Sequence, residues 1–149
     1  MGEQTVPKRA LAVALLLTVA VLASAQQRKS RYKIIVSRDN PLASIARKDL
    51  SAIFLRRRTV WPDGSPVSPV DQVGTARMRD DFSRDVHGRS ASAIRSYWRQ
   101  LVFSGRGVPP VEKATDHEVI EYVKRRPGAV GYVSAGARTD EVKVLRIDP

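Results

Sequence analysis

The residues able to support catalytic or metal chemistry are few in this chain. It has no cysteine and only two histidines, His87 and His117, whereas a zinc site needs several nitrogen or sulfur ligands at workable spacing. Asp80 and Asp81 are adjacent, so on a helix they point to different faces and do not form a catalytic pair. No Gly-x-Ser-x-Gly nucleophile motif occurs in the sequence. We therefore expect a protein that is not an enzyme and that needs no cofactor and no metal.

Short glycine motifs do not indicate a nucleotide site either. Gly74-Thr75 and the Gly-Arg-Gly at 105–107 are too short for the glycine-rich loops that hold dinucleotides or nucleotide phosphates. Arginine is the remaining candidate. Arg77 and Arg79 stand at the start of a predicted helix, where a guanidinium group can hold an oxyanion through charge-assisted hydrogen bonds. The alternative is that both face water, as arginines on helix surfaces usually do.

The elements that would position these side chains follow from hydrophobic spacing and from turn residues. Runs that are rich in β-branched residues, or that have an apolar residue at every second position, predict strands. Apolar residues at i, i+3 and i+4 predict helices. We expect strands at 32–37, 67–70, 129–133 and 142–147, and helices at 47–55, 77–86, 91–103 and 116–125. Their large aromatic residues Phe82, Phe103 and Tyr132 are expected in the core, and His87 lies at a predicted helix end, where a cation interacts favourably with the helix dipole.

The stretch at 126–133 reads as a helix end, a turn and a buried strand. Pro127 cannot continue a helix, and Gly128 permits a sharp reversal. Gly131 lies inside the strand that follows, where a glycine allows another segment to come close. Upstream, Thr115 and Glu118 have the spacing of a capping box. This order of elements predicts an α/β domain with a mixed sheet flanked by helices.

The first 25 residues have the features of a secretory signal peptide. Lys8-Arg9 precedes an apolar run, and Ala23-Ser24-Ala25 is a cleavage pattern. A membrane anchor is the alternative, but the run is shorter than the ~20 residues that a spanning helix needs. We expect residues 1–25 to be cleaved, 26–31 to form a disordered leader, and 32–149 to form one exported, periplasmic domain without stable membrane insertion.

The chain is strongly basic, with a formal charge of +11. Such a charge suits an anionic partner, and because an exported protein seldom meets nucleic acid, we expect none as a partner. A small anionic solute or an anionic envelope surface is the better match. The plainer alternative is a solvated, arginine-rich surface.

A series of short motifs resembles a known family. They are Ile53-Phe54-Leu55, Trp61-Pro62-Asp63-Gly64, Arg79-Asp80-Asp81-Phe82, Tyr97-Trp98, Phe103-Ser104-Gly105, Pro109-Pro110 and the Pro-Gly-Ala-Val-Gly-Tyr-Val run at 127–133. In this order they resemble the periplasmic phosphate-binding proteins of ABC transporters, of the type 2 periplasmic-binding fold. The resemblance implies a domain equivalent to a single lobe of a two-lobe receptor.

The resemblance also implies a place for the ligand. The family holds phosphate at a Ser-Gly-Thr-Arg-like turn at a helix N-terminus, a few residues before a phenylalanine. Counted back from Phe82, this chain keeps Arg79 but has Arg77 within the triplet where the family has Ser-Gly-Thr; a shifted register places Gly74 and Thr75 on the Gly-Thr pair. The resemblance thus implies Gly74, Thr75, Arg77 and Arg79 as oxyanion contacts.

Two functions remain open at this point. One is an exported solute-binding domain that binds phosphate or another oxyanion, if only weakly. The other is an interaction or scaffold module of the cell envelope that has lost ligand binding. The sequence leaves the oligomeric state undetermined.

Overall fold

The computed structural model describes residues 31–73 and 77–149, which include a six-stranded sheet with the strand order β2-β6-β1-β5-β3-β4. The strands are β1 (Tyr32–Val36), β2 (Ser44–Ala46), β3 (Ser68–Gln72), β4 (Val111–Lys113), β5 (Ala129–Ser134) and β6 (Lys143–Asp148). Strand β1 is antiparallel to both of its neighbours, β5 and β6. The pairs β2–β6, β3–β4 and β3–β5 are parallel. The expected mixed sheet is therefore confirmed.

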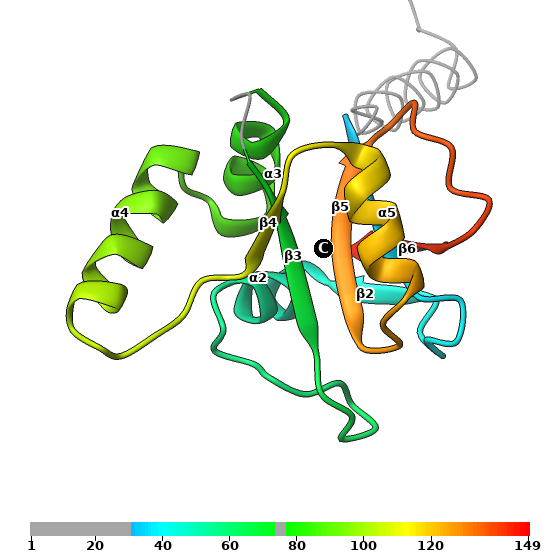
Figure 1. Ribbon diagram of the computed structural model, residues 1–149, viewed down its shortest axis with the longest axis horizontal. Helices are drawn as coiled ribbons and strands as arrows, with labels where there is room; N and C mark the ends of the chain where they lie inside the picture. Colours follow the sequence, from blue (N-terminus) through cyan, green and yellow to red (C-terminus); the bar gives the residue numbers. More distant parts are fainter. Residues whose placement is uncertain (1–30, 74–76) are drawn as a thin grey trace, which may run out of the picture. The chain divides into compact units, whose positions relative to one another are not determined.

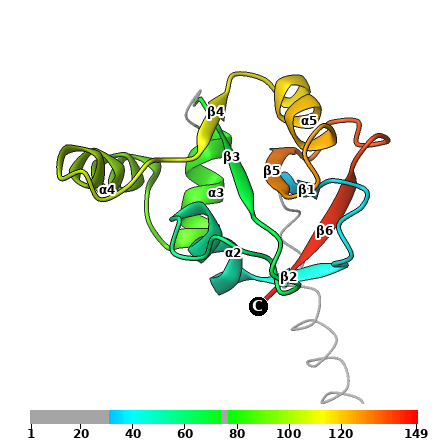
Figure 2. The same cartoon turned by 60° about the horizontal axis from the view of Figure 1, so that its bottom comes forward.

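Helices cover both faces of this sheet. The helices on the faces are α2 (Arg47–Phe54), α3 (Arg77–His87) and α5 (Asp116–Lys124), and a fourth helix, α4 (Ala91–Phe103), lies beyond the edge of the sheet. Two clusters of buried residues, one with side chains from α2 and α3 and one with side chains from α5, lie on opposite faces. Neighbours along a strand alternate between them: Ile34 joins the first cluster and Ile35 the second. Figure 2, turned from Figure 1, shows α5 on one side and α2 and α3 on the other.

Strand β5 lies inside the sheet, between β1 and β3, and Gly131 lets α5 come close to it. A Cβ atom added at Gly131 would lie 2.7 Å from a methyl group of Val119 and 2.8 Å from one of Val70. These separations are too short for any side chain, so glycine at this position allows the helix to pack. The close approach predicted for a glycine within this strand is confirmed.

The capping signals in the sequence also act as predicted. Thr115 accepts a hydrogen bond from the Glu118 backbone N–H at 3.2 Å, and the Glu118 carboxylate accepts one from the Thr115 N–H at 3.1 Å. Ser90 caps α4 by accepting a hydrogen bond from the Ala93 N–H at 3.2 Å. Both helices thus start where their capping residues place them.

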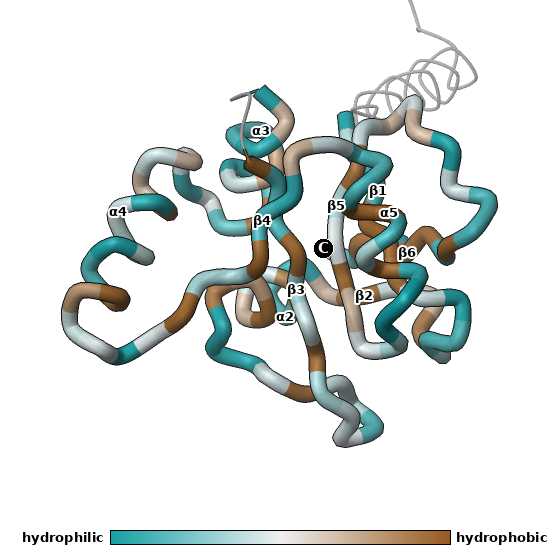
Figure 3. Tube along the Cα trace, viewed as in Figure 1, coloured by the Kyte–Doolittle hydropathy of each residue, from teal (hydrophilic) through white to brown (hydrophobic). Residues whose placement is uncertain are grey.

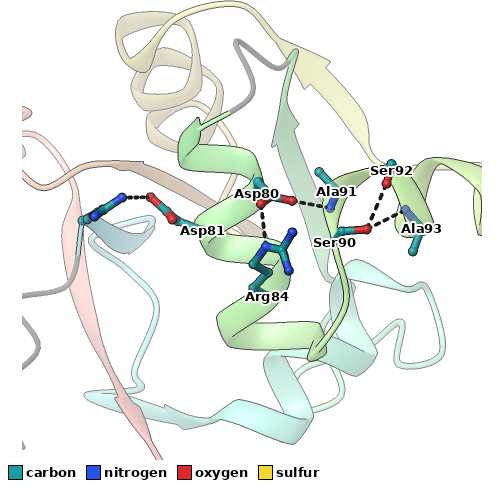
Figure 4. Close-up of polar contacts among 8 residues, drawn as sticks. Asp80, Asp81, Arg84, Ser90, Ala91, Ser92 and Ala93 are labelled. Atoms are coloured by element: carbon teal, nitrogen blue, oxygen red, sulfur yellow. Dashed lines mark hydrogen bonds and ion pairs between the residues drawn. The ribbon is translucent and has the colours of Figure 1, made fainter.

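Helix α4 lies beside α3, beyond the β4 edge of the sheet (Figures 1 and 2). Figure 4 shows the polar connection between the two helices. Asp80 accepts a hydrogen bond from the Ala91 N–H at 2.9 Å and another from Arg84 at 2.6 Å. Its neighbour Asp81 forms an ion pair with Arg31 instead, at 3.0 Å. As expected, the two adjacent carboxylates have separate partners, and Asp80 fixes the start of α4 against α3.

One expected core residue is on the surface. Phe82 and Tyr132 are buried, but Phe103 is 97% exposed. It occupies the last turn of α4, and the buried residues of that helix are Ala91, Ile94 and Trp98. Figure 3 shows hydrophobic residues at this outer end of α4 as well as along the central strands. The prediction for Phe103 was wrong because helical spacing identifies an apolar face without showing how much of it another element covers.

His87 is not a cation at neutral pH. Its Nδ1 atom lies 2.8 Å from the Ser51 hydroxyl oxygen, and its ring packs edge-on against Phe82. Burial, with a smaller contribution from the charge of Arg57, lowers the pKa of His87 from 6.5 to about 4. Burial of the ring thus disfavours the charged form of His87 more than the helix end favours it.

This histidine predicts a loss of stability in weak acid. Between about pH 6.5 and 4 the unfolded chain binds a proton at His87 and the folded chain does not, so the stability contribution is complete above pH 6.5 and is lost as the pH falls toward 4. One pKa unit corresponds to ~1.4 kcal/mol, so the lowering of the His87 pKa from 6.5 to about 4 limits the loss to about 3.5 kcal/mol. Urea unfolding across this range should show a shallower decline for His87→Gln than for wild type. The control His117→Gln, in an exposed first turn of α5, should follow wild type; equal slopes for all three proteins would contradict this account.

Three further outcomes concern the predicted elements and domains. The predicted strands and helices are present, and the two three-residue strands β2 and β4 were not predicted. The predicted signal peptide and residues 26–30 of the leader lie outside the described residues, and Arg31 belongs to the described domain. Across the described ranges, none of the helices has the length and apolar character needed to cross a bilayer.

Candidate functional site

A buried polar cluster links the end of β3 to the first turns of α3. Asp71 and Gln72 at the end of β3 and Arg79 in α3 are each exposed by less than a tenth. Arg79 donates to an Asp71 carboxylate oxygen at 2.9 Å and to the Gln72 carbonyl oxygen at 3.0 Å. It also pairs with Glu112 of β4 at 2.7 Å. Arg79 thus connects β3, β4 and α3, and its guanidinium group forms ion pairs with two carboxylates, those of Asp71 and Glu112.

The Asp71 carboxylate accepts hydrogen bonds from three sides. Besides Arg79, the Tyr132 hydroxyl donates to it at 2.5 Å and the Gln72 N–H at 2.8 Å. Burial raises the pKa of Asp71, while the Arg79 guanidinium and these hydrogen bonds act against that rise. We take the pair as ionised, because an arginine in a protein stays charged and three donors meet at the carboxylate. Burial also raises the pKa of Tyr132, which keeps its hydroxyl a donor.

The cluster extends to the helix on the other face of the sheet. The Gln72 side-chain amide donates to Asp116 in the first turn of α5, at 2.8 Å, and to the Tyr132 carbonyl at 3.0 Å. Asp116 in turn accepts from the Ser134 hydroxyl at 2.5 Å. The ends of β3 and β5 and the start of α5 are therefore held together by hydrogen bonds.

One donor in this cluster is left over. Arginine has five N–H donors, and the Nε atom of Arg79 is buried with no hydrogen-bond partner in the described part of the chain. Buried polar groups nearly always have partners, so an unsatisfied one needs a water or an ion to explain it. Arg79 also lines a cavity, and this combination marks its surroundings as the candidate site.

The cavity lies along α4 and has a volume of about 380 Å³. Most of its wall comes from one side of α4, and the rest comes from α3, the loop before β4 and β4 itself. The lining residues are Arg79, Ser92, Arg95, Ser96, Trp98, Arg99, Pro109 and Glu112. Binding sites for small molecules typically occupy 300–1,000 Å³, so the space is sufficient for one.

Positive charge dominates the α4 side of this cavity. Arg95 and Arg99 are one helical turn apart, which places them on the same side of the helix. Arg99 donates to the Ser96 hydroxyl at 3.0 Å. Within the described ranges, no carboxylate lies at ion-pair distance from Arg95 or Arg99, whereas Arg79 has both Asp71 and Glu112. The two α4 guanidinium groups can therefore pair with an incoming anion.

The site residues implied by the family resemblance are only partly placed. Gly74 and Thr75 lie outside the described residues. Arg77 is the first residue of α3 and is exposed, whereas Arg79 is buried and lines the cavity. Whether these four residues contact a ligand stays a prediction. The structure adds Arg95 and Arg99, which the sequence analysis did not single out.

A signal for the α4 arginines is nevertheless present in the sequence. Ser92, Arg95, Ser96 and Arg99 follow the spacing i, i+3, i+4 and i+7, which puts all four on one face of a helix. Polar residues at that spacing usually mark a solvated surface, and nothing in the sequence shows that the loop and β4 close over this face.

The histidines do not belong to this site. His87 is bonded to Ser51, and neither residue lines the cavity. His117 lies in the first turn of α5 and is exposed. No group of three or more potential metal ligands occurs within the described ranges. The cavity is lined instead by guanidinium, hydroxyl, carboxylate and apolar groups.

Comparison with known proteins identifies the fold. No protein-family model matches the chain, and no curated protein matches its sequence. A structure from Clostridium perfringens, described as a phosphate ABC transporter substrate-binding protein with bound phosphate, aligns with a TM-score of 0.62 at 19% identity. An ABC-type phosphate transport receptor from Vibrio cholerae aligns with a TM-score of 0.56 at 18% identity.

Both alignments cover 78% of this chain but only 44% and 45% of the respective receptors. The chain therefore has the fold of phosphate substrate-binding proteins, as the motifs indicated, and spans less than half of their length. At this level of identity the similarity concerns the fold alone, namely the α/β fold that the chain shares with part of those receptors.

Proposed function

We propose that this protein is an exported, periplasmic solute-binding domain whose ligand is phosphate or a related oxyanion. The observation that carries the proposal is the cavity beside α4, where no carboxylate of residues 31–73 or 77–149 lies at ion-pair distance from Arg95 or Arg99. A fold whose similar structures are described as phosphate receptors supports it. The predicted signal peptide at 1–25 supports export. Binding rather than catalysis is proposed, in line with the described roles of those receptors.

The buried cluster has a supporting role in this proposal. Arg79 is neutralised by Asp71 and Glu112, so it contributes one edge of the cavity and a hydrogen-bond donor rather than an unpaired charge. Arg95 and Arg99 supply the charge that attracts the anion. Gly74, Thr75 and Arg77, at the entry to α3, are proposed as additional contacts on the family resemblance alone.

The proposal predicts that the α4 arginines control anion affinity. A hydrogen bond to a charged group contributes ~1.5–3 kcal/mol, and 1.4 kcal/mol corresponds to a tenfold change in affinity. Arg95→Ala/Arg99→Ala should therefore weaken binding of phosphate or sulfate by at least about tenfold in isothermal titration calorimetry at low salt.

The matched control removes two positive charges elsewhere. Arg138 and Arg146 are exposed, do not line the cavity and each pair only with a neighbouring aspartate. Arg138→Ala/Arg146→Ala should leave anion affinity within about twofold of wild type, a limit set by long-range charge alone. Absence of heat and of a thermal shift with millimolar phosphate, sulfate and an organic phosphate monoester would refute the proposed function.

The exposed end of α4 favours a second function, that of an envelope interaction or scaffold module. Phe103, Val108 and Val102 are 97%, 73% and 54% exposed, and large apolar side chains gathered on a surface often mark a contact with another protein. A monomer that binds phosphate tightly, with Phe103 intact or replaced by serine, would count against this second function.

A further inference from the structure

The candidate cavity is larger than an inorganic phosphate ion requires. Its volume of about 380 Å³ lies in the roughly 300–1,000 Å³ range of sites that bind drug-sized molecules, whereas phosphate has only five non-hydrogen atoms. The lining residues of α4 run from Ser92 to Arg99, and at a rise of 1.5 Å per residue this segment is about 10 Å long. A bare phosphate held by the arginines would leave most of this length unfilled.

The wall of the cavity carries more than anion-binding groups. Trp98 and Pro109 provide apolar surface, and Ser92, Ser96 and Glu112 provide hydroxyl and carboxylate groups. The Glu112 carboxylate is 42% exposed, so a ligand hydroxyl can donate to it. Ser96 accepts from Arg99, which leaves its own O–H as a donor. Such a wall suits an organic body that has both hydroxyl groups and C–H surface.

Both sides of the cavity are held in place by packing. Asp80 fixes the N-terminus of α4 against α3. At the other end, Gly107 packs against α4, because a Cβ atom added there would lie 3.3 Å from a Leu101 methyl carbon and 3.5 Å from the Trp98 ring. The Arg106 N–H donates to the Leu101 carbonyl at 2.9 Å. The start of the loop before β4 is therefore held against the C-terminal end of α4.

We propose that the ligand of this cavity is an organic phosphate monoester with a hydroxylated body, and not inorganic phosphate. Arg95 and Arg99 bind the phosphate group. The body lies along α4 toward Trp98 and Pro109, with hydroxyl groups directed to Ser96 and Glu112. This inference rests on the proposed function, because it places the organic ligand in the same oxyanion site.

Calorimetry with three probes tests the ligand class. Glycerol 3-phosphate should bind at least tenfold more tightly than inorganic phosphate, and glycerol should not bind detectably. If inorganic phosphate binds as well as glycerol 3-phosphate, the organic-ligand inference is wrong while the oxyanion function stands. If neither phosphate compound binds, both proposals fail.

A cavity-filling variant tests the location. Ser96→Leu places an apolar side chain inside the cavity and should reduce the affinity for glycerol 3-phosphate by at least tenfold. Gln100→Leu is the matched control, because Gln100 is exposed on the same helix and does not line the cavity; it should behave as wild type. If both variants lose affinity for glycerol 3-phosphate equally, or if neither loses any, the ligand does not lie in this cavity.

The headgroup of phosphatidic acid carries the same phosphate monoester, so a vesicle-binding experiment is needed to distinguish a lipid from a small soluble ligand. Vesicles of phosphatidylcholine with phosphatidic acid present the monoester at a membrane surface. Under our proposal, soluble glycerol 3-phosphate should displace any protein that these vesicles retain. If the vesicles retain as much protein at saturating glycerol 3-phosphate as without it, the proposal of a small soluble ligand is wrong.

Discussion

Replacing Arg79 by methionine is expected to destabilise the folded domain by about 3–5 kcal/mol. Methionine preserves much of the buried stem but removes the guanidinium group that pairs with Asp71 at 2.9 Å and with the Gln72 carbonyl at 3.0 Å. The Asp71 carboxylate would then remain buried without a compensating charge, and breaking a buried ion pair from one side costs this amount. Urea unfolding at pH 7 measures the change.

The control for this prediction lies two residues earlier in the same helix. Arg77 is exposed, so Arg77→Met should change the free energy of unfolding by no more than ~0.5 kcal/mol, as surface substitutions usually do. A loss of similar size in both variants would show that helix α3 is sensitive to charge in general. Wild-type stability of Arg79→Met would contradict a buried ionic pair.

The pH dependence of Arg79→Met provides an independent check on the cause. Without the guanidinium group, the folded-state pKa of Asp71 should rise well above its unfolded value near 3.9. A carboxyl group with a raised folded pKa is least costly at low pH, where it is protonated in both states, and the cost increases as the pH rises through the folded pKa. The stability deficit relative to Arg77→Met should therefore narrow between pH 7 and pH 4. A constant deficit would indicate lost packing instead.

Replacing Phe82 by alanine should have an effect of the same order, about 3–5 kcal/mol, the usual range for a buried aromatic residue. Phe82 is 1% exposed and stacks on Tyr132 with ring centroids 4.0 Å apart and planes 7° apart. It also contacts the rings of Phe54 and Tyr32 at 4.8 and 5.4 Å. The substitution would leave a cavity between α3 and the centre of the sheet, and thermal and urea unfolding would both detect it.

Phe103 offers a control with the same change of side chain. It is 97% exposed at the end of α4, so Phe103→Ala should keep the free energy of unfolding within ~0.5 kcal/mol of wild type. Anion binding in this variant should also be unchanged, because Phe103 does not line the cavity. If Phe103→Ala destabilised the protein as much as Phe82→Ala, the outer end of α4 would have to be covered in solution.

Local sequence determined most of the elements and the class of fold. The capping residues Thr115 and Ser90 start their helices where predicted, and Pro127 and Gly128 separate α5 from β5. These signals act through the backbone within a few residues, so they can be read without knowledge of the fold. The apolar spacing of α3 likewise identified Phe82 as buried. The order of the motifs predicted a single lobe of a phosphate-receptor-like fold, and the structural similarity supports that fold.

Only the tertiary structure determined which residues form the candidate site and which of them are buried or paired. The three-residue strands β2 and β4 are too short for a periodic pattern and form only because β6 and β3 supply hydrogen-bond partners. Arg77 and Arg79 look alike in the sequence, yet one is exposed and the other is enclosed by Asp71 and Glu112, which lie 8 residues before it and 33 residues after it. Arg95 and Arg99 become a candidate anion site only because the loop before β4 returns alongside α4. Burial and long-range pairing depend on segments that are distant in sequence, and for that reason no local pattern contains them.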